Sequence, residues 1–298
     1  MNRKRVFFFL CVIVLVVSSC GTGSATGPAI PPANYIKNEG SDTLVNLVLA
    51  WAEQYQQEHP EIQISVTGGG SGTGITALIN GTIDIANASR AMAADEINAA
   101  ESAKFEPIQF VVARDAIAVI VNPTNPVSRL TLKQISDIYK GLITNWKEVG
   151  GEDRPIIKLS RESNSGTHVY FLENVIRLGS KTDKSIFSAD TLLLPSSEGI
   201  IAEVSDNPNA IGYDGLGYVS PQVKVIAIAK DEQGPEIIPS VESVNNGTYP
   251  MSRQLYMYTH GQPEGIVLDY IHWIQSDEAQ QIVTELGFVP ITAAGGIQ

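Results

Sequence analysis

The sequence predicts an α/β fold, and three observations support this prediction. From Tyr35 onward, short β-rich segments alternate with segments whose apolar residues recur at helical spacing. Such alternation is typical of α/β domains with mostly parallel sheets. Three of the turns that lead from a strand into a helix are rich in Gly, Ser and Thr. About 260 residues follow the leader and tether described below, which is enough for two modest domains.

Periodicity and stop signals place the individual elements. The apolar residues of the first helix share one face, and His59-Pro60 ends it. Thr131 and Gln134 predict a capping box, and Gly287 is expected to cap the last helix. The expected helices are 43–58, 75–80, 93–104, 131–139, 165–178, 198–205, 263–274 and 277–286. The expected strands are 62–66, 83–88, 110–121, 156–159, 210–213 and 223–229.

The N-terminus has the features of an export signal. A basic start, residues 3–5, precedes an apolar run of eleven residues, 7–17, whereas a membrane-spanning helix needs roughly 20 residues. The run ends at Ser18-Ser19-Cys20, which resembles the lipobox of bacterial lipoproteins, in which the Cys is lipidated. The alternative is ordinary cleavage near Ser19 with an incidental Cys. Residues 1–19 are thus expected to be a signal peptide and 20–35 a flexible tether.

Cysteine count and charge exclude several classes of protein. Of the two cysteines, Cys11 lies in the leader and Cys20 is the lipidation candidate, so the mature domain has no disulfide or thiolate metal site. The formal net charge is −12, and removal of the leader leaves 17 basic against 32 acidic residues. Nucleic acid is therefore not expected as a partner. A bound anion would have to be held by local dipoles and one or two charges.

The first of the three turns is 39–44, which contains Ser41, Asp42 and Thr43. Ser and Asp are strong N-cap residues, so helix capping alone could explain one of them. The functional interpretation is that the free N–H groups at this helix start face an anion.

The second turn, Gly68–Gly74, has five glycines in seven residues. Glycine allows the backbone to approach a ligand closely, and a glycine loop between strand and helix can cradle an anion with its N–H groups. Gly70 and Ser71 are the candidate binding residues. The loop is not a Walker A motif, because no Gly-Lys-Ser/Thr follows. The alternative interpretation is a turn without a ligand.

The third turn, 160–167, carries Arg161, Ser165, Gly166 and Thr167. Arg161 supplies a planar, permanently charged fork that suits oxyanions, while Ser165 and Thr167 supply hydroxyls and Gly166 an unhindered N–H. The alternative is a surface ion pair between Arg161 and Glu162, with Ser165 as a simple cap.

At these residues the sequence closely resembles the phosphate-binding proteins of high-affinity phosphate ABC transporters. That family has an Arg-x-x-x-Ser-Gly-Thr motif, intact here from Arg161 to Thr167, and a glycine-loop serine matched by Ser71. Further similarity runs through 135–141, 145–146 and 211–213, and the resemblance covers nearly all of 36–292.

The resemblance implies a type II periplasmic-binding-protein fold, with two α/β lobes joined by two crossover strands near 112–120 and 250–257. Lobe 1 would comprise 36–115 and 251–298, and lobe 2 would comprise 116–250. Inorganic phosphate would be buried between the lobes and delivered to the permease subunits of an ABC importer. The protein would be a monomer, lipid-anchored on the extracytoplasmic face of the membrane. No cofactor, metal or catalytic residue is expected.

One position departs from the family pattern. Many members place an Asp after the third strand to accept the proton of hydrogen phosphate, and here Arg90 falls at that place. Because Arg90 occupies this position, it is a candidate phosphate contact. Asp42, where the family commonly has Thr, is the candidate replacement acceptor.

Two other functions remain open from the sequence. A secreted phosphatase-like enzyme is disfavoured because no Gly-x-Ser-x-Gly elbow occurs and the four histidines lack metal-ligand spacing. His168 does lie beside Thr167, where a base could act, although a packing role is commoner there. A binding protein for another oxyanion, such as sulfate or molybdate, is the second alternative.

Lipidation of Cys20 gives the first testable prediction. Cys20→Ser should remove the acyl acceptor and release an otherwise intact domain from the membrane. Detergent fractionation of cells that express each form would measure this. Membrane retention of the variant equal to that of the wild type would contradict lipidation at Cys20.

Overall fold

The computed structural model describes residues 34–291. The predicted signal peptide 1–19, the lipidation candidate Cys20 and nearly all of the predicted tether therefore lie outside the described residues. The first strand begins at Tyr35, so the last residue of the predicted tether belongs to the folded domain. None of the helices in 34–291 is long and apolar enough to cross a membrane.

In this part of the chain, nine strands form one mixed sheet in the order β2-β1-β3-β11-β4-β8-β6-β7, with β9 also paired to β4, and β10 and β5 form a separate pair. The strands are β1 (Tyr35–Gly40), β2 (Gln63–Thr67), β3 (Ile85–Ala88), β4 (Pro107–Val121), β5 (Arg129–Thr131), β6 (Ile157–Arg161), β7 (Leu192–Leu194), β8 (Ala210–Gly215), β9 (Lys224–Val225), β10 (Ala227–Ala229) and β11 (Ser252–His260).

The helices follow the strands in alternation. They are α1 (Asp42–Glu58), α2 (Ser71–Ile79), α3 (Ala94–Ser102), α4 (Leu132–Tyr139), α5 (Gly166–Phe171), α6 (Ser197–Asp206), α7 (Val241–Asn245), α8 (Gly265–Ile274) and α9 (Asp277–Glu285). Short 3-10 helices occupy Trp146–Val149 and Leu216–Tyr218, and a π-helical turn, Leu172–Ile176, continues α5.

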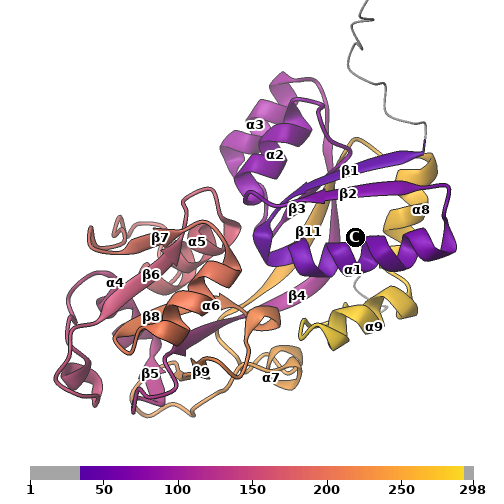
Figure 1. The fold of residues 1–298 in the computed structure, drawn as a ribbon. Helices are drawn as coiled ribbons and strands as arrows, with labels where there is room; N and C mark the ends of the chain where they lie inside the picture. Colours follow the sequence, from indigo (N-terminus) through magenta and orange to yellow (C-terminus); the bar gives the residue numbers. More distant parts are fainter. Residues whose placement is uncertain (1–33, 292–298) are drawn as a thin grey trace, which may run out of the picture. The chain divides into compact units, whose positions relative to one another are not determined.

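Helices cover both faces of the sheet (Figure 1). The apolar faces of α1, α8 and α9 pack on one side of β1, β3 and β11, and α6 extends the same core toward β6. A smaller core lies between α2, α3 and the other side of β3. A third core joins α4, α5 and α7 to β4 and β8. Both faces of the sheet are therefore covered, as the alternation of strands and helices predicts.

The long strand β4 connects the two halves of the sheet. Up to Ala116 it pairs with β11, and from Ile117 onward it pairs with β8. The chain returns next to this point, where Ile117 donates to the carbonyl of Met251, just before β11 begins. The sequence predicted mostly parallel sheets. Five of the nine strand pairings in the described residues are parallel, and the four antiparallel ones all involve β4 or β11, the crossover strands.

Several predicted elements differ in detail. The strand predicted over 223–229 divides into β9 and β10, which pair with β4 and β5 respectively. Helix α2 begins at Ser71, inside the segment predicted to be a loop, because Gly72 and Gly74 adopt helical backbone there. The helix predicted over 165–178 divides into α5 and the π-helical turn. The capping box of α4 is confirmed, with Gln134 donating its backbone N–H to the Thr131 hydroxyl and accepting from the Thr131 N–H. Gly287 is confirmed in left-handed backbone at φ 78° after α9.

The packing of α2 on β1 generates the second prediction. A Cβ at Gly74 would lie 2.6 Å from both the Glu39 carbonyl oxygen and the Gly40 Cα. Alanine is the better helix former by about 1 kcal/mol, but this overpacking against backbone should cost about 1–3 kcal/mol. Gly74→Ala should therefore lower the free energy of unfolding, measured by urea denaturation.

Gly72→Ala is the matched control in the same helix. A Cβ at Gly72 has its nearest neighbour at 3.5 Å, an ordinary contact. It should leave the stability unchanged or raise it by up to about 1 kcal/mol, which is the gain in helix propensity from glycine to alanine. A Gly74→Ala protein as stable as the control would contradict the steric account.

Candidate functional site

Three helix starts form the candidate site, and each comes after a strand end. Helix α1 begins after Ser41, α2 after Gly70 and α5 after Ser165. The N–H groups of a first helical turn have no partner within the helix. The donors of the three turns can therefore face the same ligand only if the turns lie close together.

The first and third turns meet through their hydroxyls. The Thr43 and Thr167 Oγ1 atoms lie 2.8 Å apart, and both residues are buried. The second turn reaches the same point through Gly166, where a Cβ would lie 2.4 Å from the Ser71 Oγ and 2.5 Å from the Ser89 Oγ. Only glycine allows this approach of α5 to the end of β3 and the start of α2.

The glycine turn and the third turn also contact through backbone. Gly72 donates to the Asn164 carbonyl at 3.1 Å, and the Asn164 amide donates back to the Gly69 carbonyl at 2.8 Å. Gly70 has φ +94°, and a Cβ there would lie 2.8 Å from the Asn164 carbonyl oxygen. The glycines of this turn therefore serve close backbone contact, as the sequence predicts.

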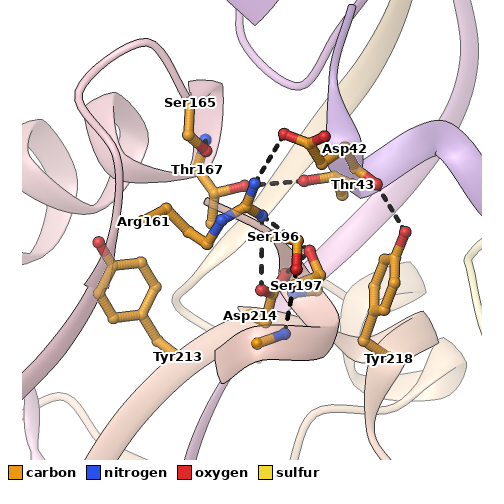
Figure 2. A network of polar contacts seen from close by, with 12 residues as sticks. Asp42, Thr43, Arg161, Ser165, Thr167, Ser196, Ser197, Tyr213, Asp214 and Tyr218 are labelled. Atoms are coloured by element: carbon orange, nitrogen blue, oxygen red, sulfur yellow. Dashed lines mark hydrogen bonds and ion pairs between the residues drawn. The ribbon is translucent and has the colours of Figure 1, made fainter. Parts of the chain in front are cut away.

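Asp42 does not cap α1. Its Oδ1 accepts from the Gly69 N–H at 3.0 Å, and its Oδ2 accepts from Arg161 Nη2 at 2.7 Å. Ser41, the N-cap residue, makes no side-chain capping bond. The capping interpretation of this turn was therefore wrong, because the carboxylate joins the first turn to the other two. Figure 2 shows its contact with Arg161.

Arg161 is fully buried, so the surface-pair alternative with Glu162 was wrong. Its Nη1 donates to the Ser197 hydroxyl at 2.7 Å and lies 3.6 Å from Asp214 Oδ2, while Nη2 also donates to the Pro195 carbonyl at 2.9 Å. Figure 2 shows the guanidinium between Asp42 on one side and Asp214 with Ser197 on the other. Two carboxylates thus compensate this buried charge.

Burial raises the pKa of the Asp214 carboxyl, and the nearby Arg161 charge opposes that rise. The Asp214 Oδ1 accepts from Ser197 and from the Gly215 N–H. Its Oδ2 is buried without a hydrogen bond. Asp214 therefore contributes negative charge next to Arg161 without satisfying all its hydrogen-bonding capacity.

Sequence reasoning missed a second buried ion pair beside the site. Arg253 on β11 donates to Asp115 on β4 at 2.9 and 3.2 Å. The same guanidinium donates to Thr167 at 3.0 Å and to Thr43 at 3.3 Å. One signal could have indicated this pair: Asp115 interrupts the apolar run 110–121, and a charge in such a strand needs a buried partner.

Ser89, Ser197 and Asp214 were also missed. Ser89 donates its backbone N–H to the Ser71 hydroxyl at 3.0 Å. Ser197 and Asp214 both contact Arg161, as described above. Ser89 and Ser197 have no distinctive sequence signal. Asp214 is a charged residue within the buried strand β8, which is the same kind of signal as Asp115 in β4.

Arg90 lies apart from the contacts that join the other predicted residues. Both of its terminal nitrogens donate to the Glu96 carboxylate at 2.7 Å, and Nη1 also donates to the Ala91 carbonyl. Its Nη2 would lie 3.7 Å from a Cβ at Gly72. The guanidinium therefore lies next to the start of α2, but its fork is directed to Glu96.

His168 packs under the site. Its Nδ1 lies 2.9 Å from the Arg161 carbonyl oxygen and 3.1 Å from the Ser160 hydroxyl, and its ring stacks on Phe187. Burial lowers the pKa of this imidazole, which favours its neutral form. His168 thus supports the strand end that carries Arg161.

The arrangement is suited to an oxyanion. The three helix starts carry the hydroxyls of Ser41, Ser71 and Ser165 together with first-turn N–H groups, and the third turn adds the buried guanidinium of Arg161. Hydrogen-bond donors of this kind complement oxyanion oxygens. Within residues 34–291, no cluster of three or more His, Cys, Asp or Glu residues could hold a metal ion.

Comparisons with known proteins point to the same chemistry. The PBP superfamily domain matches residues 26–278. The phosphate-binding protein PstS of Pseudomonas aeruginosa PAO1 is 31% identical over 98% of this chain and 96% of its own length.

Two solved structures are similar to this fold at 32% identity. One is a substrate-binding protein from Clostridium perfringens, assigned to a phosphate ABC transporter and solved with bound phosphate. It has a TM-score of 0.77 and covers 87% of this chain and 100% of its own. The other is an ABC-type phosphate transport receptor from Vibrio cholerae, with a TM-score of 0.68 and coverage of 86% and 100%.

Proposed function

Because the chain belongs to the PBP superfamily and, within it, to the family of the PstS phosphate-binding proteins, we propose that it captures inorganic phosphate and delivers it to an ABC importer. Its fold is the type II periplasmic-binding-protein fold, with two α/β lobes joined by two crossover strands. The finer assignments below rest on this premise and on the geometry of the site.

One observation carries the proposal: the three strand-to-helix turns meet one another, because Asp42 bonds to both Gly69 and Arg161 and Gly72 bonds to Asn164. Phosphate is then bound by Arg161, by the hydroxyls of Ser41, Thr43, Ser71, Ser165 and Thr167, and by first-turn N–H groups including that of Gly166. The predicted contact at Gly70 is not the N–H group, because that group donates to the Gly40 carbonyl at 2.9 Å. Arg161 and Arg253 face Asp42, Asp115 and Asp214. Since these charges do not sum to a positive site, hydrogen-bond donors and helix dipoles provide most of the attraction. Arg90 adds positive charge at the edge, held by Glu96.

The lobes are 36–115 with 251–298, and 116–250. The partner change of β4 at Ala116 and Ile117 supports these boundaries. The contacts of Asp42 with Arg161 and of Gly72 with Asn164 join the two lobes. They fit a closed state in which the anion is buried, and release would require hinge opening.

The protein acts as a binding protein and not as an enzyme. His168, which follows Thr167, has its Nδ1 directed to the Arg161 carbonyl. Lipidation at Cys20 would hold the monomer on the extracytoplasmic face of the membrane, beside the permease subunits that receive phosphate.

Calorimetric titration of the full chain with phosphate, sulfate, arsenate and molybdate tests the function, and Arg161→Ala tests the site. Phosphate should bind without turnover of a chromogenic phosphate ester. Arg161→Ala leaves a buried anion short of charge, and truncation of a buried charged partner typically costs about 2–5 kcal/mol.

Arg154→Ala is the control for Arg161, because Arg154 pairs with Glu152 away from the site. It should bind phosphate like the wild type. If folded Arg161→Ala kept its affinity within about tenfold, a change of about 1.4 kcal/mol, Arg161 would not belong to the site.

Asp42 should provide the selectivity for phosphate. A carboxylate has about four acceptor sites, and two are used by Gly69 and Arg161. A remaining site can accept the proton of hydrogen phosphate but faces only lone pairs on sulfate. Asp42→Asn should therefore weaken phosphate binding and improve sulfate binding relative to it, measured by calorimetry at fixed pH and salt.

The competing role of Asp42 is that of a counter-ion for Arg161 only. In that case Asp42→Asn would change the affinities for phosphate and sulfate by the same factor. An unchanged phosphate-to-sulfate ratio would therefore exclude the acceptor role.

A further inference from the structure

A single guanidinium connects both crossover strands to both sides of the site. Arg253 lies on β11 and is 7% exposed. Its guanidinium donates to Asp115 on β4, the other crossover strand. The Asp115 carboxylate also accepts from the Leu216 N–H. Because both members of this ion pair belong to the crossover strands, the guanidinium has a defined position relative to the hinge.

From this position Arg253 reaches residues of both lobes. In lobe 1, Nη1 donates to the Ser89 carbonyl at 3.1 Å and Nη2 to the Thr43 hydroxyl at 3.3 Å. In lobe 2, Nη2 donates to the Thr167 hydroxyl at 3.0 Å, and the guanidinium lies 5.6 Å from the centre of the Tyr170 ring. The contacts to Thr167 and Tyr170 depend on the lobes being together.

The contacts that Arg253 makes between the lobes lie next to open space. A cavity of about 400 Å³ is bordered by Arg253 and also by lobe 1 at Ala91 and lobe 2 at Val169 and Asn174. The lobes are therefore not packed continuously on this side. The polar contacts of Arg253 can break without opening an apolar core.

Arg253 also determines where the hydroxyl protons of Thr43 and Thr167 point. A hydroxyl has one proton and two acceptor lone pairs. Both oxygens accept from Arg253, and they lie 2.8 Å from each other. One hydroxyl therefore donates to the other, which leaves one proton to donate to an anion between the lobes.

We propose that Arg253 is a positioning residue that latches the closed state and orients the Thr43 and Thr167 hydroxyls toward the bound anion. The proposal rests on the proposed function, in which phosphate binds between the lobes. Because the latch forms only on closure, it should slow phosphate release and leave phosphate entry nearly unchanged.

The test measures phosphate release from the full-length protein in detergent. Protein loaded with radioactive phosphate is chased with unlabelled phosphate, and association is followed by rapid filtration. The variant is Asp115→Asn with Arg253→Gln, because Arg253→Gln alone would leave Asp115 buried and unpaired. Loss of the charged hydrogen bonds should raise the dissociation rate about 10- to 100-fold, with the association rate within about threefold of wild type.

Arg114→Gln is the matched control. Arg114 lies beside Asp115 on β4, but its guanidinium donates to Asn245 and to the Pro290 carbonyl. It should dissociate phosphate at the wild-type rate. If the double variant does not fold, Tyr170→Leu is compared with Tyr170→Phe, since both lose the hydrogen bond of the Tyr170 hydroxyl to the Ser252 carbonyl but only the Leu variant loses the ring next to Arg253. The Leu variant should release phosphate about three- to tenfold faster than the Phe variant.

The possible outcomes separate the two proposals. A wild-type protein that does not bind phosphate would contradict the proposed function itself. A wild-type protein that binds phosphate, with folded variants that release it at the wild-type rate, would contradict the latch alone. A lower melting temperature with an unchanged dissociation rate would mean that Arg253 has only a structural role.

Discussion

The site depends on the burial of the Arg161 guanidinium. A buried charge must be paired and hydrogen-bonded, because its transfer out of water is otherwise too costly. Arg161 meets this need with groups from different parts of the chain: Asp42 from the start of α1, Ser197 from the start of α6 and Asp214 from β8. The pairing therefore holds the first and third turns together, and Asp42 adds the glycine turn through the Gly69 N–H.

Arg253 and Asp115 form a second buried ion pair, which lies on the two crossover strands. Each pair places an arginine between segments that lie far apart in the chain: Arg161 pairs with Asp42 and Asp214, and Arg253 pairs with Asp115. An acidic protein can thus present donors to an anion without a positive surface, since the attraction comes from oriented N–H and O–H groups at short range. This resolves the apparent conflict between the net charge of −12 and an anionic ligand.

Glycine positions set how closely the turns can approach. Gly166 lies against the Ser71 and Ser89 hydroxyls, and Gly70 lies against the Asn164 carbonyl. A side chain at either position would hold the turns apart and weaken the contacts of Thr43 with Thr167. The glycines of the Gly68–Gly74 segment serve two purposes, because Gly74 also allows α2 to pack on β1.

The sequence alone determined the α/β class, most helices, the three turns and the presence of Arg161 among them, because these depend on local periodicity and on residue types within short segments. It also predicted the α4 capping box, whose atoms are three residues apart. The role of Asp42, the partners of Arg161 and the commitment of Arg90 to Glu96 were decided only by the tertiary structure. The same is true of Arg253, which meets Thr43 and Thr167 although the three lie far apart in the chain. Local sequence patterns carry no information on such pairings, because the partners of a buried charge are distant in sequence and become neighbours only in the folded structure.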